Sequence, residues 1–557
     1  MKKNQFVCTV LFSLCCTLFS QEALKSIEEE YYDFLSLQGI TERPYLNYRT
    51  LSDSEWNIKN QEENENPLHP WEGLNLGTKK TLKKELFNQT NWFLKGINNS
   101  VNLKIYGPEW FNSYNTTAPY GQNDGALWQG KGYNSSLTAG VRLEALGFEI
   151  TLKPQICFSQ NLEFEHLPGA YDSEYSYFYK EGGNIDFVQR FGDKPFWTFD
   201  LGDTEIRWSL YNFTIGFGTQ SPWLGPAFLN PMLGSNNAPS YPKFDIGLRK
   251  TKIVIPGINW HFGDIEARLW TGLLKESDYF DNNSENNKNM LNALSISFAP
   301  SFIPGLTIGL NRIFLTKWKA ENLKYIGRLF TLSRSNDVTG EGEDQKFSIT
   351  ADFCFPKIGF EVYGEFGRDD FSSDETSNPF HTAIYTIGAK QIIPLPVQWL
   401  KFQLLFEWNN FEMSQDFQMQ WQYKGYYSHG KISQGYTNKG QILGAGSGSF
   451  GNSQFLGLKA YFPKGSAMFF FHRHCPDNNY IYNKTVGKPI TSNSPEYDQY
   501  YASFMTYRTF SLSGNYFITN NFILDGEIAY TIINNNYYNK NNDKQNFRFT
   551  LTVKYNF

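Results

Sequence analysis

Aromatic and amide side chains gather in two long polar stretches of the chain. Residues 219–244 read TQSPWLGPAFLNPMLGSNNAPSYPKF, and residues 121–134 read GQNDGALWQGKGYN. Sugar rings present apolar C–H faces that stack on aromatic rings, while sugar hydroxyl groups hydrogen-bond to amides and carboxylates. This mixture therefore favours carbohydrate binding. The residues that carry the prediction are Trp128, Trp223, Asn230, Asn236, Asn237 and Tyr241.

Two structural interpretations compete with a binding role for these residues. Transmembrane β-barrels carry a girdle of aromatic side chains at each membrane interface, and for any single aromatic residue the girdle is the more frequent explanation. Asn236 and Asn237 can equally brace their own loop through hydrogen bonds to the backbone. The binding hypothesis therefore depends on the combination of residues and on where the loops lie.

No motif predicts catalysis, a cofactor or a metal site. The stretch GSGSFG (446–451) matches G-x-G-x-x-G, but a strand-like segment follows it, whereas nucleotide binding needs a helix there. His472, His474 and Cys475 share a strand-like segment, but no second cluster of metal ligands accompanies them. No serine lies in a nucleophile-elbow context. We therefore expect no catalytic residue, no cofactor and no metal.

The composition limits the class of protein. Of 557 residues, 17% are aromatic, and beyond the N-terminus there is no run of about eighteen apolar residues, which excludes a helical membrane protein. The formal net charge of −5 gives no general attraction to nucleic acid. Beyond the N-terminal segment only Cys157, Cys354 and Cys475 remain, and they are too few and scattered for a disulfide framework.

Residues 1–20 have the features of a secretory signal peptide. Two lysines precede an apolar run over 6–19, and Ser20 supplies the small residue of a cleavage site. The run is too short to span a bilayer. A lipoprotein signal at Cys15 is the alternative, but Leu14 stands where such a signal requires a small residue. We therefore expect export and cleavage after Ser20.

From residue 92 onward the chain alternates between apolar and polar residues, as it does over 205–210, 244–249 and 265–269. A soluble sandwich would bury its apolar faces against each other and turn its charges to water. A transmembrane barrel turns its apolar faces to lipid and its charges to the lumen. The charges on the polar faces include Glu205, Arg207, Asp245, Arg249, Glu266 and Arg268.

The number and spacing of the candidate strands favour the barrel. Tight turns such as PLP (394–396) alternate with long loops such as 160–202, and about eighteen strands give the even number that bacterial outer-membrane barrels have. The candidate strands are 100–107, 136–146, 147–159, 203–211, 212–218, 243–255, 262–274, 290–299, 305–315, 345–354, 357–367, 380–391, 397–412, 452–463, 466–475, 500–516, 520–532 and 545–557.

The C-terminal sequence RFTLTVKYNF supports the same prediction. Phe549, Leu551 and Phe557 alternate with Arg548 and Lys554, so the chain ends on an aromatic residue of an outward-facing row. This looks like the signal by which the barrel-assembly machinery recognises outer-membrane barrels. The fold class we predict is all-β, a transmembrane antiparallel barrel over 92–557.

Residues 21–91 differ from the barrel, and we expect a small periplasmic helical subdomain there. Apolar residues recur at helical spacing over 21–38. Ser52 and a glutamate three residues later form a capping box for a second helix. Leucines among lysines over 79–87 predict a third helical piece. Whether these helices plug the lumen or dock below it stays open.

Strand direction places the connection 219–242 on the outside of the cell. If the barrel ends in the periplasm, the strand 212–218 runs outward and the connection after it is extracellular. Its five prolines cannot serve in a central strand, but in a long loop they fix φ and stiffen the chain.

The stretch SPWLGPAFLNPMLGSNNAPSYPKFDIGLRK resembles the central motif of the Wzi family of capsule assembly proteins. The residues that fit it in order are Trp223, Gly225, Pro226, Ser235, Asn236, Asn237, Ala238, Pro239 and Pro242. The later stretch SQGYTNKGQILGAGSG is similar to the family's second motif and adds Tyr436 as a candidate glycan-binding residue. The family's second motif continues to an aspartate-rich stretch that SGSFGNS lacks.

The resemblance implies an outer-membrane barrel lectin. Such a protein holds exported capsular or other surface polysaccharide at the cell exterior, and its other partners are outer-membrane lipid and the barrel-assembly machinery. The alternative is a diffusion porin whose lumen-facing charges line a pore, although charges of both signs can equally pair and close it. A barrel hydrolase is the third class, but it would need a catalytic cluster, and the sequence shows none.

Overall fold

The computed structural model describes residues 26–58, 69–180, 183–331, 342–369, 383–397, 399–412, 425–485, 493 and 502–557. The expected signal peptide and its cleavage site lie outside these residues. Among the described residues, no helix has the length and apolar character needed to cross a lipid bilayer.

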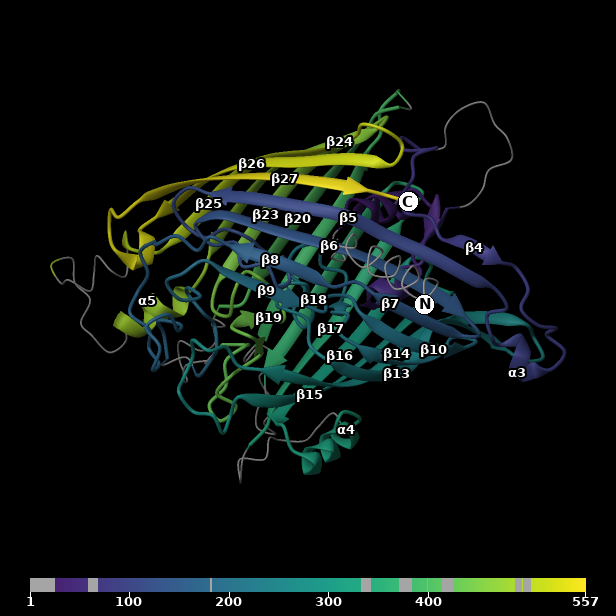
Figure 1. The fold of residues 1–557 in the computed structure, drawn as a ribbon, viewed down its shortest axis with the longest axis horizontal. Helices are drawn as coiled ribbons and strands as arrows, with labels where there is room; N and C mark the ends of the chain where they lie inside the picture. Colours follow the sequence, from purple (N-terminus) through teal and green to yellow (C-terminus); the bar gives the residue numbers. More distant parts are fainter. Residues whose placement is uncertain are drawn as a thin grey trace, which may run out of the picture.

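Eighteen antiparallel strands close into a barrel, as the sequence predicts (Figure 1). Two of these strands are interrupted and consist of two segments each. β7 and β8 form one strand, since both pair with β6. β9 and β10 form the next one, since β9 pairs with β8 and β10 pairs with β7. The barrel closes where β27 pairs with β5, with Phe549 opposite Tyr114. The strands are β5 (Val101–Asn115), β6 (Gly132–Ala145), β7 (Phe148–Leu152) with β8 (Gln155–Ser159), β9 (Phe196–Asp200) with β10 (Glu205–Leu210), β11 (Phe213–Gly218), β13 (Lys243–Ile255), β14 (Trp260–Lys275), β15 (Lys288–Pro300), β16 (Leu306–Lys317), β17 (Asp344–Phe355), β18 (Phe360–Asp369), β19 (Ala383–Ile393), β20 (Lys401–Asn410), β23 (Asn452–Phe462), β24 (Gly465–Cys475), β25 (Thr506–Phe517), β26 (Phe522–Asn534) and β27 (Lys544–Tyr555).

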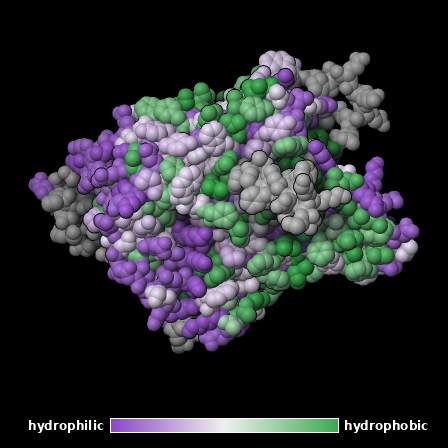
Figure 2. All heavy atoms as spheres, in the orientation of Figure 1, coloured by the Kyte–Doolittle hydropathy of each residue, from purple (hydrophilic) through white to green (hydrophobic). Residues whose placement is uncertain are grey.

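The strands turn apolar side chains outward and polar side chains inward. In β27, Phe549 and Leu551 are exposed on the outer surface, whereas Arg548 and Lys554 are buried inside. Successive side chains of a strand point to opposite faces, so a period of two in the sequence separates a lipid face from a lumen face. Figure 2 shows apolar side chains gathered in a broad zone across the strands, with hydrophilic side chains at the end that carries the long connections.

The connections alternate in length, as predicted. The short turns lie at one end of the barrel, at 146–147, 211–212, 256–259, 301–305, 356–359, 394–400, 463–464 and 518–521. The longer connections whose residues the structure describes in full or in part lie at the other end, at 116–131, 160–195, 219–242, 276–287, 318–343, 411–451, 476–505 and 535–543. The described parts of the long connections carry small elements: β12 (Trp223–Leu224), η2 (Ala320–Lys324), α4 (Tyr325–Arg328), β21 (Thr437–Asn438), β22 (Gln441–Ile442), α5 (Asn478–Thr485) and η5 (Asn536–Tyr538).

Several strand boundaries shift by a few residues from the prediction, and the largest differences concern β5 and β9. β5 continues past the expected end at residue 107 to Asn115, because a bulge between Tyr106 and Glu109 accommodates Pro108 within the strand. β9 lies inside the stretch expected to be a loop, and it pairs with β8 from Phe196 to Asp200. It is short, so its alternation was too brief to detect from the sequence.

The N-terminal segment lies inside the barrel, at the end with the short turns. The helix α2 (Ile27–Ser36) turns three acidic side chains to three lysines of the barrel wall. These ion pairs are Glu28 with Lys554 at 2.7 Å, Glu30 with Lys459 at 2.5 Å and Asp33 with Lys390 at 2.7 Å. The short strands β1 (Thr41–Glu42), β2 (Tyr48–Arg49) and β3 (Asn57–Ile58) and the turn η1 (Leu51–Asp53) follow.

From residue 69 the described chain runs to the first barrel strand. Trp71 packs on Phe517, and its Nε1 donates to the Gly465 carbonyl at 2.9 Å. β4 (Lys80–Lys83) pairs with the start of β5, and α3 (Trp92–Lys95) follows.

The prediction of the first helix is confirmed where the structure describes it, but the other two predicted helices are wrong. Ser52 lies in a single 3-10 turn with Thr50 at its N-cap, and Lys80–Lys83 form a strand because β5 offers them a free edge. The division of the chain at residue 91 into a periplasmic subdomain and a barrel stays a prediction.

Candidate functional site

The connection 219–242 folds into the lumen, where a carboxylate of the barrel wall holds its backbone. Glu407 of β20 is buried and accepts hydrogen bonds from the backbone N–H groups of Phe228, Leu229 and Asn230 at 2.6, 3.0 and 2.8 Å. Consecutive N–H groups that converge on one anion form a strong charge-assisted site. Glu407 therefore fixes the middle of the connection against β20.

A second carboxylate of the barrel wall, Glu365, binds the connection on both sides of the three residues held by Glu407. Glu365 of β18 accepts the N–H groups of Ala227 and Met232 at 3.3 and 2.9 Å. Gly225 has φ +94°, and a Cβ at this position would overlap Glu365 Oε1. The glycine of the motif is therefore required by both the backbone conformation and the close approach of the carboxylate.

The structure places most of the predicted binding residues inside the protein. Trp223 donates its Nε1 hydrogen to the Ala227 carbonyl at 3.0 Å, and the Tyr436 hydroxyl donates to the Leu233 carbonyl at 2.6 Å. These side chains shape the connection and are covered by it. The buried residues are Trp223, Asn230, Asn236, Tyr241 and Tyr436, whereas Trp128 and Asn237 are half-buried.

Asn236 and Asn237 join three connections of the barrel. The Asn236 carbonyl accepts from the N–H of Gly125 at 2.6 Å, in the connection after β5. The Asn237 side chain accepts from the N–H of Asn123 at 3.3 Å and donates to the carbonyl of Ile442 at 3.0 Å, in the connection before β23. The pair therefore links its own connection to two others, whereas the alternative interpretation of these asparagines expects local hydrogen bonds within their own loop.

A cavity of about 590 Å³ lies beside the connection 219–242, and Trp128 and Asn237 line it. It runs along the inner side of β23–β27, from the long connections down to Glu30 of α2. Its lining combines aromatic, amide and charged side chains, among them Gln122, Asp124, Trp128, Phe164, Phe178, Asn237, Gln441, Tyr507, Glu527, Tyr537 and Arg548.

The chemistry of this cavity suits a polyhydroxylated ligand. Trp128 packs edge-on against Phe191, with ring centroids 5.1 Å apart, so the indole is held in one orientation at the wall. Burial raises the pKa of Asp124 to about 6, although Arg548 opposes this effect. Fixed aromatic rings beside amide and carboxylate groups can stack on sugar rings and hydrogen-bond to their hydroxyl groups.

The N-terminal segment supports the connection 219–242 from below. β2 pairs with β12, with Arg49 opposite Trp223, and the N–H of Gly225 donates to the Asn47 carbonyl at 2.9 Å. Arg49 also lies over the Trp223 ring, 5.8 Å from its centroid. Two segments that are distant in the sequence therefore form one body inside the barrel.

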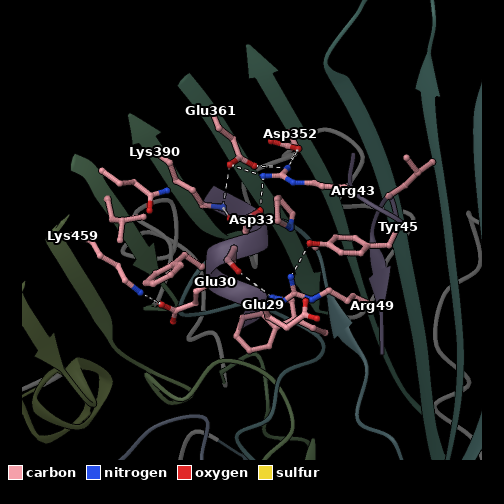
Figure 3. A pocket seen from close by; sticks show the side chains of 18 of the residues that line it. Glu29, Glu30, Asp33, Arg43, Tyr45, Arg49, Asp352, Glu361, Lys390 and Lys459 are labelled. Carbon is pink, nitrogen blue, oxygen red and sulfur yellow. Dashed lines mark hydrogen bonds and ion pairs between the residues drawn. The ribbon is translucent and has the colours of Figure 1, made fainter. Parts of the chain in front are cut away.

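A small pocket of about 60 Å³ separates α2 from the connection 219–242 and is lined by acids and bases that point toward one another (Figure 3). Arg43 reaches Asp33, Asp352 and Glu361 at 2.8, 2.9 and 2.7 Å. Lys390 reaches Asp33 and Glu361 as well. The cluster anchors the N-terminal segment to β17, β18 and β19.

Comparison with known proteins identifies the family. The family model described as capsule assembly protein Wzi matches residues 112–547. The chain belongs to the Wzi family. No curated protein sequence matches it.

Solved structures share the fold at low sequence identity. The Wzi structure from Escherichia coli, described as an outer-membrane protein involved in group 1 capsule assembly and a carbohydrate-binding β-barrel, superposes with a TM-score of 0.51 and 12% identity. The match covers 81% of this chain and 84% of that one. OccAB4 of Acinetobacter baumannii is more distant, with a TM-score of 0.38 at 10% identity over 81% and 97% of the two chains. The chain thus has the fold of an outer-membrane barrel.

The weaker motifs of this Wzi-family chain also face the cavity. Gly446 and Gly448 of the glycine-rich stretch line it. His472 and His474 stack on each other in its wall, and His474 Nε2 contacts the Ser447 carbonyl at 2.7 Å. Among the described residues, no three potential metal ligands of the His, Cys, Asp or Glu type lie together.

Sequence reasoning missed the carboxylates that hold the Wzi-family motif. Glu365 and Glu407 each lie on the lumen face of a strand with a period of two, so the sequence could mark them as inward-facing. Nothing in the sequence pairs them with a connection more than a hundred residues away in the chain.

Proposed function

We propose that this protein binds exported surface polysaccharide, of the capsular kind, at the outer face of the outer membrane and helps to attach or assemble it there. The long connections would then face the cell exterior and the short turns the periplasm. The protein acts by binding and carries out no catalysis. The apolar outer surface meets outer-membrane lipid, and the C-terminal row ending at Phe557 meets the barrel-assembly machinery during biogenesis.

The observation that carries the proposal is the cavity beside the Wzi-family motif. Its volume of about 590 Å³ falls in the range of about 300–1,000 Å³ that is usual for small-molecule sites. A space of this size accepts a short stretch of a sugar chain, or its end, while the rest of the polymer stays outside.

The motif residues divide into two roles under this proposal. Trp128 and Asn237 form part of the wall that contacts sugar. Trp223, Asn230, Asn236, Tyr241 and Tyr436 act from inside, because they are buried and keep the motif in the shape that forms the wall. Their replacement is expected to reduce binding by deforming the loops.

The experiment compares two tryptophans in whole cells. Trp128→Ala removes a ring from the cavity wall, whereas Trp197→Ala removes a ring that is 72% exposed on the outer surface of β9. We expect Trp128→Ala to release polysaccharide from the cell surface and Trp197→Ala to retain it, with both barrels assembled and heat-modifiable. Equal retention by the two variants would refute the assigned site.

A further inference from the structure

Residues 80–97, which comprise β4 and α3 and lead into β5, lie at the short-turn end of the barrel, and we call them the excursion. In Figure 1, β4 and α3 project there from the wall of strands. Three large apolar side chains of this excursion are turned to the outside: Leu82 is 61%, Trp92 69% and Phe93 46% exposed. Trp92 and Phe93 are neighbours in the chain, and adjoining exposed apolar side chains mark a contact surface.

The excursion is held in this position by the barrel. The Tyr211 hydroxyl donates to the Trp92 carbonyl at 2.8 Å, and the Tyr211 N–H donates to the Gly96 carbonyl at 2.7 Å. Asn91 caps α3 by accepting the Leu94 N–H at 2.9 Å. A side chain at Gly96 would overlap the Tyr211 ring. Trp92 and Phe93 are thus presented outward by a fixed backbone.

The exposed rings continue the apolar outer surface of the barrel. The ring centroids of Trp92 and Tyr211 are 5.9 Å apart, and Tyr211 is itself 51% exposed. Leu146 and Phe148, at the neighbouring short turn, are also exposed. Tryptophan and tyrosine at this height of a barrel occupy the boundary between lipid headgroups and hydrocarbon.

The charges of the excursion are mostly positive. Lys80, Lys83, Lys84 and Lys95 are exposed, against Glu85 as the one acid over 80–97. Lysines beside apolar side chains lay their alkyl stems along the hydrocarbon and place their ammonium groups among the headgroups. Positive charge next to an apolar surface fits anionic phospholipid, which attracts lysines near a membrane surface.

We propose that residues 80–97 form an interfacial anchor, which inserts Leu82, Trp92 and Phe93 into the leaflet at the short-turn end and binds anionic phospholipid headgroups through the four lysines. The anchor is independent of glycan binding, because it lies at the opposite end of the barrel. It fixes the point at which the chain passes from the lumen segment to the first membrane strand.

The test places an environment-sensitive fluorophore beside the anchor. Thr90, which is exposed, is replaced by cysteine and labelled with a nitrobenzoxadiazole dye, in the full chain with its native cysteines changed to alanine. The protein is reconstituted in phosphatidylcholine vesicles with or without phosphatidylglycerol. The matched control carries the label at Ser284, an exposed residue of a long connection.

We expect the dye at position 90 to emit at shorter wavelength and to be quenched by a lipid spin-labelled near its headgroup, several-fold more than the dye at position 284. Trp92→Ser with Phe93→Ser should abolish this difference, and Lys83→Glu with Lys84→Glu should reduce it only in the phosphatidylglycerol vesicles. These residues are exposed, so the variants should remain heat-modifiable. A water-like spectrum at position 90 in both vesicles, or a shift that grows with protein concentration and so reports a second copy, would overturn the proposal.

Discussion

At the scale of single residues, buried carboxylates of the barrel wall decide the shape of the motif. Glu407→Gln keeps the size of the side chain but removes the charge that attracts three backbone N–H groups. Because hydrogen bonds to charged groups contribute about 1.5–3 kcal/mol, we expect the connection 219–242 to lose stability by about 2 kcal/mol. Amide hydrogen exchange over Phe228–Asn230 measures this loss.

Glu321→Gln is the matched control for that substitution, since it neutralises an exposed glutamate in a different connection. It should leave the exchange of 228–230 at the wild-type rate. If Glu407→Gln exchanged as slowly as this control, the carboxylate would not be what holds the loop.

Two aspartates, Asp33 and Asp53, determine how the docking of the N-terminal segment depends on pH. Burial alone would raise the pKa of Asp53, but Arg268 and Arg249 outweigh burial and hold that pKa below its usual range. Cations beside Asp33 likewise lower its pKa against the effect of burial. A carboxyl group with a lowered pKa stabilises the folded state above its unfolded pKa of about 3.9, and this stabilisation is lost as the pH falls through the folded value.

We therefore expect residues 26–58 to stay docked in the lumen from pH 7 to about 4, and to loosen below that pH. Limited proteolysis at several pH values from 7 to 2, with endoproteinase Glu-C above pH 4 and pepsin below it, follows the release, with the intact strands as internal reference. Loosening that began already between pH 7 and 5 would contradict this assignment of the ion pairs.

At the scale of elements, β2 and β12 couple the N-terminal segment to the Wzi-family motif. Asn47 is central, because its side chain bonds to Ser295, Asn311 and Thr350 while its carbonyl accepts the Gly225 N–H. Asn47→Ala removes the hydrogen-bond partner of Ser295, Asn311 and Thr350, which lie on three different strands. Leaving such buried polar groups without a partner lowers the free energy of unfolding by about 1–3 kcal/mol. We expect faster amide exchange in both 26–58 and 219–242.

The control for this element is Glu42→Gln, which removes the ion pair between Lys250 and a glutamate side chain that is 65% exposed. Such a surface pair contributes little stability, so exchange in 219–242 should not change. If Asn47→Ala accelerated exchange in 26–58 alone, the two segments would not be coupled.

The elements that the sequence predicts well are those with a local signal. The barrel strands alternate in period two, and the turns between them carry Pro, Gly and Asn, so strand number and connection length follow from short stretches. The inward fold of 219–242 could not be predicted, because it depends on Glu365 and Glu407, which are distant in sequence. The same limit applies to β4, whose helical pattern was overridden by the edge of β5.

At the scale of the whole molecule, the paired lumen charges favour a closed barrel over a diffusion porin. Arg207 binds Glu205 and Asp245 at 2.7 Å each, and Arg268 binds Asp53 at 3.1 Å and Asp245 at 2.9 Å. The N-terminal segment and the connection 219–242 occupy the space that a porin leaves to water. We expect no large steady current from the protein in planar bilayers, and a steady open current would favour the porin.

The central claim is that the cavity beside the motif binds surface polysaccharide, and equilibrium binding tests it most directly. The purified full-length protein in lipid nanodiscs is titrated with the polysaccharide of its own cell. We predict binding by the wild type and by Trp197→Ala, and binding about tenfold weaker for Trp128→Ala, since one aromatic stacking contact contributes up to about 1.5 kcal/mol. Absence of binding by the wild type, or equal affinity of Trp128→Ala and Trp197→Ala, would contradict the claim.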